Sequence, residues 1–184
     1  DDTAKTWKSL MGSFGIDQRN YFGVDGLALD PNNPDIVYIA AGKDISSGTS
    51  DVLKSTDRGE TWTKTNLNKR FSGNGKLRFT GELIAVDPAN SNIVYVGTRQ
   101  EGLYRSQNAG RDWERIYAVP TGGAITNTGV TGFPESNESI GIRGVTFGKN
   151  TADGGKSQTI YVNVMGKGIY RSTNGGSTWG LIPN

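Results

Sequence analysis

Three charged residues occupy equivalent places in the sequence and could do acid–base or binding chemistry. Asp25, Glu82 and Arg143 each lie a few residues before an Asp-Pro dipeptide or the position that corresponds to it, and apolar residues flank them. Two carboxylates about 5–9 Å apart are what hydrolysis of a glycosidic bond requires, and Asp25 is our candidate general acid or base. The alternative is a hydrated ring of charges that satisfy one another, in which Arg143 pairs with Glu82.

A repeated turn motif indicates how these residues are positioned. Three segments follow the pattern Ser-x-Asp/Asn-x-Gly-x-Thr/Asp-Trp, and a partial fourth copy ends at Trp7. The Trp-to-Trp intervals are 55, 51 and 66 residues, and such self-similarity is typical of repeat architectures. The defining residues of the three complete motifs are Asp57, Gly59 and Trp62; Asn108, Gly110 and Trp113; and Asn174, Gly176 and Trp179.

Each motif lies among four short apolar runs bounded by Gly, Asn and Pro, which predicts four strands per unit. Four strands per unit of about 55 residues are typical of β-propeller blades. We therefore predict an all-β chain with blades of four antiparallel strands at 12–67, 68–117 and 118–184, preceded at 1–11 by the last strand of another blade. About three blades do not close a ring, so two sheet edges would stay exposed. The remaining blades are expected from the same parent chain or from other copies.

The motif has a physical role in its turn. Its Asp or Asn can accept hydrogen bonds from backbone N–H groups, its Gly can adopt a positive φ, and its Trp can pack between blades. It resembles the Asp-box, or bacterial neuraminidase repeat, of sialidases, xyloglucanases, sorting receptors and photosystem assembly factors. We interpret these residues as structural, on the face opposite the one where propellers usually bind. One fold hosts many activities, so the motif does not decide the function.

Among these families, the chain does not fit the sialidases but is similar to the xyloglucanases, the family 74 glycoside hydrolases. Sialidases need a Phe/Tyr-Arg-Ile-Pro segment, and the Arg115-Ile116 dipeptide here is followed by Tyr. The stretch 20–31 is similar to the start of the second blade of the xyloglucanases. The stretch 78–88 is similar to their Gly-Arg-Gly-x-Gly-Glu-Arg-Leu-Ala-Val-Asp-Pro segment, with some glycines lost.

The resemblance implies an endo-acting hydrolase of plant β-glucans. These enzymes use two Asp residues, one from each of two propeller domains that face each other across a cleft. The first-domain Asp lies in a Val-Asp-Gly tripeptide, which Val24-Asp25-Gly26 reproduces. The flanks of this tripeptide fit the second blade, whereas the family's catalytic Asp lies in the first. The resemblance therefore carries over the family and leaves catalysis by Asp25 as a separate hypothesis.

Loops that follow each fourth strand are expected on the same face as the charged residues, at about 12–22, 68–80 and 118–140. Aromatic rings stack on the C–H faces of sugars, while carboxylates and guanidinium groups bond their hydroxyls. We predict that Tyr21 and Phe133 are exposed platforms of this kind. The complete set of predicted substrate-binding residues is Tyr21, Glu82, Arg143, Arg78 and Phe133.

Composition excludes several classes of site. The 184 residues contain no His and no Cys, so a Ser–His–Asp triad, a Cys nucleophile and a Cys/His zinc site are excluded. We predict no metal and no cofactor. A net charge of +2 gives no case for nucleic acid or an anionic membrane as partner, and no apolar run approaches the ~20 residues that span a bilayer. The resemblance implies a secreted or cell-surface protein whose signal peptide is not in this chain.

Three functions remain open. The first is part of a polysaccharide-degrading enzyme whose second carboxylate lies elsewhere on a longer chain, and the length of the gene tests it. The second is a non-catalytic propeller that binds a glycan or a protein, which the lost glycines near Arg78 favour; it predicts affinity without cleavage. The third is a structural propeller closed by several short chains, which predicts a defined oligomer.

Overall fold

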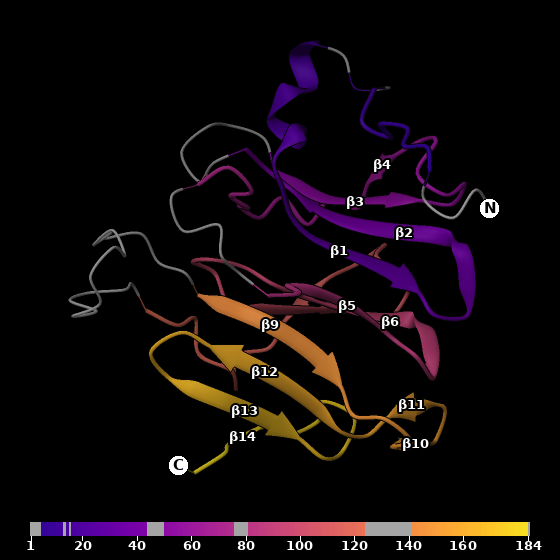
Figure 1. Cartoon of the computed structure of the whole chain (residues 1–184). Helices are drawn as coiled ribbons and strands as arrows, with labels where there is room; N and C mark the ends of the chain where they lie inside the picture. Colours follow the sequence, from indigo (N-terminus) through magenta and orange to yellow (C-terminus); the bar gives the residue numbers. More distant parts are fainter. Residues whose placement is uncertain are drawn as a thin grey trace.

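A computed structural model describes residues 5–12, 14, 16–43, 50–75, 81–123 and 141–183. Three four-stranded antiparallel sheets follow one another along the chain and stack in sequence order (Figure 1). The first strands of the three sheets, β1, β5 and β9, lie side by side. This arrangement confirms the prediction of an all-β chain of propeller blades.

The first sheet consists of β1 (Val24–Asp30), β2 (Asn33–Ala41), β3 (Asp51–Ser55) and β4 (Thr63–Lys64), with the 3-10 helix η1 (Ile16–Phe22) before it. The second sheet consists of β5 (Ile84–Asp87), β6 (Asn90–Gly97), β7 (Leu103–Ser106) and β8 (Glu114–Arg115). The third consists of β9 (Ile142–Phe147), β12 (Ile160–Val164), β13 (Gly168–Ser172) and β14 (Gly180–Leu181). A separate hairpin is formed by β10 (Ala152–Asp153) and β11 (Lys156–Ser157).

The segment before η1 differs from expectation. Its described residues 5–12 form bends and a turn, whereas we predicted the final strand of a preceding blade. The fourth strand of a blade forms its hydrogen bonds with the third strand of the same blade. The described part of the chain contains no such partner strand for residues 5–12. They lie instead against the first motif, where Trp62 Nε1 donates to the Leu10 carbonyl at 3.2 Å.

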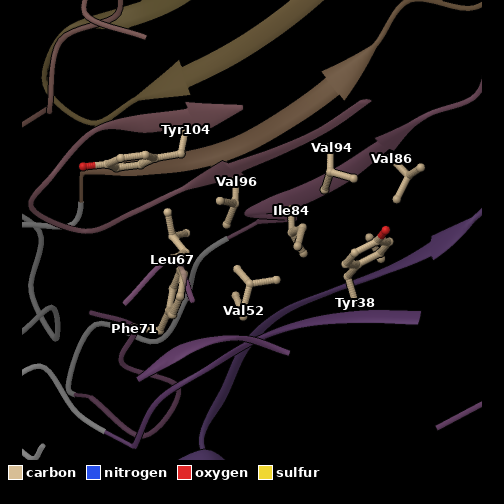
Figure 2. Packing of buried hydrophobic residues seen from close by; sticks show 11 residues of the cluster. Tyr38, Val52, Leu67, Phe71, Ile84, Val86, Val94, Val96 and Tyr104 are labelled. Atoms are coloured by element: carbon tan, nitrogen blue, oxygen red, sulfur yellow. The ribbon is translucent and has the colours of Figure 1, made fainter. Parts of the chain in front are cut away.

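The hydrophobic core lies between neighbouring sheets. Figure 2 shows Val52 and Tyr38 of the first sheet facing Ile84, Val94 and Val96 of the second, in a cluster of buried residues. An equivalent cluster joins the second sheet to the third. The second halves of β2 and β6 are buried on both faces, which explains why they are continuous apolar runs, whereas β12 of the third sheet alternates between buried and more exposed residues.

The three turns that carry the motif similar to the Asp-box, named Asp-box turns for that resemblance, repeat one set of hydrogen bonds. In the first turn the Gly59 N–H donates to Ser55 Oγ at 2.7 Å and the Thr61 N–H donates to Asp57 Oδ1 at 2.8 Å. Matching bonds are made by Gly110 and Asp112 in the second turn and by Gly176 and Thr178 in the third. All these bonds join residues four apart in sequence, so the motif itself encodes the turn.

A pH experiment follows from Asp57, which stands where the other two turns have Asn108 and Asn174. Hydrogen bonds from Thr61 and Ser55 lower the pKa of Asp57 to about 2, below its value of about 4 in an unfolded chain. The stabilisation is therefore present above about pH 4 and is lost as the pH falls toward 2. We expect Asp57→Asn, which copies Asn108 and Asn174, to remove this part of the acid sensitivity. Thermal unfolding from pH 2 to 5 measures it, and identical pH profiles for both proteins would count against the assignment.

Further polar contacts join neighbouring sheets at the end where the Asp-box turns lie. The carboxylates of the Asp-Pro dipeptides accept from backbone N–H groups in their own turns. They also reach the following sheet: Ser91 Oγ donates to Asp30 Oδ1 at 2.8 Å, and Ser157 Oγ donates to Asp87 Oδ1 at 2.6 Å. At the same end of the seam between the first and second sheets, the Tyr38 hydroxyl donates to the Ala109 carbonyl at 3.1 Å. Polar groups thus reinforce the Asp-box end of a seam whose middle is apolar.

Candidate functional site

Asp25 lies in a buried ion pair on the face opposite the Asp-box turns. Arg99, just after β6, donates through Nε to Asp25 Oδ2 at 3.0 Å and through Nη2 to Oδ1 at 2.9 Å. The backbone N–H of Ser72 also donates to Asp25 Oδ2 at 3.0 Å, and Arg99 Nη2 reaches the Ser72 carbonyl at 3.1 Å. Both charged side chains are 1% exposed. The pair thus ties β1, the segment after β4 and the end of β6 together.

This geometry argues against Asp25 as a general acid or base. A group in that role must come within hydrogen-bond reach of the substrate, whereas both Asp25 oxygens are already engaged by Arg99 and shielded from solvent. A bidentate guanidinium–carboxylate pair fixes orientation. In this structure Asp25 joins the first sheet to the second through Arg99, and this geometry favours a structural role over the catalytic hypothesis.

Glu82 and Arg143 are brought together by the seam between β5 and β9. The Val145 N–H donates to the Glu82 carbonyl at 2.9 Å, and the Gly81 N–H donates to the Arg143 carbonyl at 2.8 Å. The side chain of Glu82 is exposed, and that of Arg143 is half-buried. Burial, and then the nearby charge of Arg99, lower the pKa of the Arg143 guanidinium.

The charged ring is therefore organised differently from the alternative we described. Among the described residues, no ion pair joins Glu82 to Arg143, and Asp25 takes Arg99 as its partner. Arg99 was not among the predicted site residues. The sequence does place Arg99 directly after the apolar strand β6, and therefore at the same end of the sheets as Asp25. The sequence does not show that the two side chains meet.

Two hollows adjoin Glu82. One, of about 390 Å³, runs along the first strands of the three sheets, and the other, of about 290 Å³, lies over the third sheet. The first is mostly apolar below Glu82, with Leu27 and Leu29 exposed on its wall. Glu82 is the carboxylate that both hollows share, so it could bind a hydroxyl-rich ligand there.

The aromatic platforms are not where we predicted them. Tyr21 is 2% exposed and packs with Ile39, Ala41 and Leu53, because η1 turns it inward against the first sheet. The prediction of an exposed Tyr21 is therefore wrong. The exposed ring of this region is Phe22, and Tyr117 is 80% exposed with the Arg115 guanidinium over it. Arg78 and Phe133 lie outside the described residues.

Comparison with known proteins places this geometry in context. The chain is 40% identical over 190 residues to a xyloglucanase of Acetivibrio thermocellus and 38% identical over 186 residues to a xyloglucanase of a Paenibacillus species. The crystal structure of a family 74 xyloglucanase from Xanthomonas campestris covers 100% of the chain with a TM-score of 0.88 at 31% identity. The chain resembles part of the propeller of family 74 xyloglucanases. No protein-family model matches it.

The chain spans about a fifth of the length of these xyloglucanases. It covers 22% of the Acetivibrio protein, 18% of the Paenibacillus protein and 27% of the Xanthomonas chain. A family 74 enzyme from Niastella koreensis gives a TM-score of 0.73 at 36% identity over 91% of this chain. The xyloglucanase resemblance inferred from the repeats and from the stretches 20–31 and 78–88 is thereby confirmed.

The described residues contain no group of three acidic, His or Cys side chains able to hold a metal ion. Within the same residues, no helix has the length and apolar character needed to cross a membrane.

Proposed function

We propose that this chain is part of the propeller of a secreted xyloglucanase-type glycoside hydrolase with endo activity on plant β-glucans. The observation that carries the proposal is the 40% identity to a xyloglucanase over 100% of the chain. The three stacked sheets with their Asp-box turns add to it, as does the structural match to a family 74 enzyme. The remaining blades come from the same parent protein or from other copies.

In this proposal the chain binds the polysaccharide, and other parts of the longer protein supply the catalytic carboxylates. Glycoside hydrolysis requires two carboxyl groups that reach the substrate. Asp25 is engaged by Arg99 and buried, so the catalytic carboxylates are assigned to other parts of the longer protein. The chain supplies one wall of the polysaccharide site, built on the face that holds Glu82 and Arg143. Arg78 and Phe133 stay candidates for the same wall.

Glu82→Gln tests this wall. A charge-assisted hydrogen bond contributes about 1.5–3 kcal/mol, so its loss is expected to lower kcat/KM on xyloglucan at least about tenfold in the longer protein. Thermal stability should not change, because Glu82 is exposed. The matched control is Glu60→Gln on the Asp-box turn, which should keep full activity. Equal activity of both variants would remove Glu82 from the site.

The function itself is tested by incubating xyloglucan with the longer protein and, separately, with the chain alone. The release of reducing ends is expected from the longer protein and not from the chain. Hydrolysis by the chain alone would contradict the assignment of the catalytic carboxylates to other parts of the longer protein. Absence of hydrolysis by the longer protein would contradict the enzyme assignment.

A non-catalytic glycan-binding propeller is the second candidate, and the burial of Asp25 favours it. It predicts that the longer protein retains xyloglucan on an affinity gel without shortening it. Viscometry of the same mixture separates the two candidates, because an endo-acting hydrolase lowers the viscosity quickly.

A further inference from the structure

A second polar site lies at the seam between the first and second sheets, away from the Asp25 face. Two hollows of about 390 and 180 Å³ adjoin there and share Thr65, Asn66 and Arg111. The larger volume falls in the range of pockets that bind small ligands. We call this place the basic trough, defined by Lys54, Lys69 and Arg111 with Asn66 and Trp113.

The basic trough carries an excess of positive charge. Among the described residues that line it, Asp112 is the single carboxylate, and Asp112 already accepts from Asn108 Nδ2 at 2.7 Å. Lys69 is paired with Glu101 at 3.0 Å. Lys54 donates to the Ala109 carbonyl at 3.0 Å, and the exposed Arg111 makes a long bond of 3.4 Å to the Asn108 carbonyl. Lys64 directs its ammonium to the Tyr21 ring at 5.3 Å, on the other face of the first sheet. Two cations, Lys54 and Arg111, thus have no carboxylate paired with them among the described residues that line the trough.

The cations are also close enough to affect one another. Burial, and then the charge of Arg111, lower the pKa of the Lys54 ammonium. Like charges gathered around a hollow destabilise one another until an anion enters, so the arrangement favours a negatively charged ligand.

The repeat offers an internal comparison. In the next seam Arg105 takes the place of Lys54, and Glu114 stands where the first sheet has Thr63. Glu114 neutralises Arg105 at 2.6 Å. Ser177 of the third Asp-box turn occupies the position of Arg111. The second seam therefore keeps the fold of the first without its charge, so the cation excess is not a requirement of the propeller.

The chemistry of the lining suggests one ligand class. A guanidinium group matches the planar geometry of a carboxylate. The half-buried indole of Trp113 and the amide of Asn66 offer a stacking surface and hydrogen bonds, as sugars require. We propose that the basic trough binds a carboxylate-bearing saccharide, a uronic acid residue of a polysaccharide, independently of the xyloglucan wall at Glu82.

Titration calorimetry of the chain with trigalacturonate tests the proposal. Arg111→Ser installs the residue of the third turn and should weaken binding at least about tenfold, since charged hydrogen bonds are lost. The matched control is Arg171→Ser, an exposed arginine of the third sheet, and it should bind as the unmodified chain does. Raising the salt concentration should also weaken binding.

Four results decide between the alternatives. Equal affinity of Arg111→Ser and the unmodified chain would overturn the site, and so would equal affinity for the neutral sugar cellotriose. Binding of acetate as tight as that of trigalacturonate would overturn the saccharide part. Salt-sensitive binding of trigalacturonate alone, lost in Arg111→Ser, supports the whole proposal.

Discussion

Arg99→Ala is expected to lower the free energy of unfolding by about 3–5 kcal/mol. Removing one partner of a buried ion pair leaves the other charge without compensation, and losses of this size follow. Here the stranded group is the Asp25 carboxylate, whose side chain is 1% exposed. The Ser72 carbonyl loses a donor at the same time. Urea unfolding followed by tryptophan fluorescence measures the change.

Two variants show whether the loss belongs to the pair. Lys8→Ala breaks an ion pair with Glu60 whose partners are 71% and 56% exposed, so stability should change by less than about 1 kcal/mol. The double variant Asp25→Asn with Arg99→Met should lose less than the sum of the two single changes, because the second change removes the stranded charge. Additive losses, or an Arg99→Ala effect as small as that of Lys8→Ala, would contradict the assignment.

Gly176→Ala is expected to lower the free energy of unfolding by about 2–5 kcal/mol, as the sum of two effects. The residue has a φ of +80°, which a side chain disfavours, and an added Cβ would overlap the Tyr95 hydroxyl. Tyr95 is fully buried and packs edge-on against Trp179, so it has little room to move. Thermal or urea unfolding gives the size of the loss.

Two glycines serve as controls for this change. Gly110 has a φ of +85°, but its Cβ would lie 3.3 Å from the nearest atoms of Tyr38 and Thr65, so Gly110→Ala should lose only about 1–2 kcal/mol. Gly180 has open space around it, and Gly180→Ala should stay within about 0.5 kcal/mol of the unmodified chain. An equal loss at Gly176 and Gly110 would mean that the Tyr95 contact contributes nothing.

The sheets and the Asp-box turns could be predicted because their determinants are local. The bond from Gly59 to Ser55 spans four residues, and the motif contains both groups. The repeat then predicts that the same turn recurs at Asn108 and Asn174. The strands are also readable, since their apolar runs lie between Gly, Asn and Pro.

The candidate site could be predicted only in part, because its contacts are long-range. Alignment of the repeats brought Glu82 and Arg143 to one seam, as the structure has them. The partner of Asp25 is 74 residues away, and nothing near Asp25 indicates Arg99. Tyr21 appeared to be a loop residue, but η1 buries it, and that depends on how the helix packs on the first sheet.

The hydrogen bonds that join neighbouring sheets at the Asp-box end have a consequence for synthesis of the chain on the ribosome. Asp30 and Tyr38 receive their partners, Ser91 and Ala109, from chain made 61 and 71 residues later. At about 5–20 residues per second, the first blade waits about 3–14 s for them. During that interval the Tyr38 hydroxyl and the Asp30 carboxylate form their hydrogen bonds with water instead. Each blade is thus finished only when its successor has emerged, and folding trails translation by one repeat.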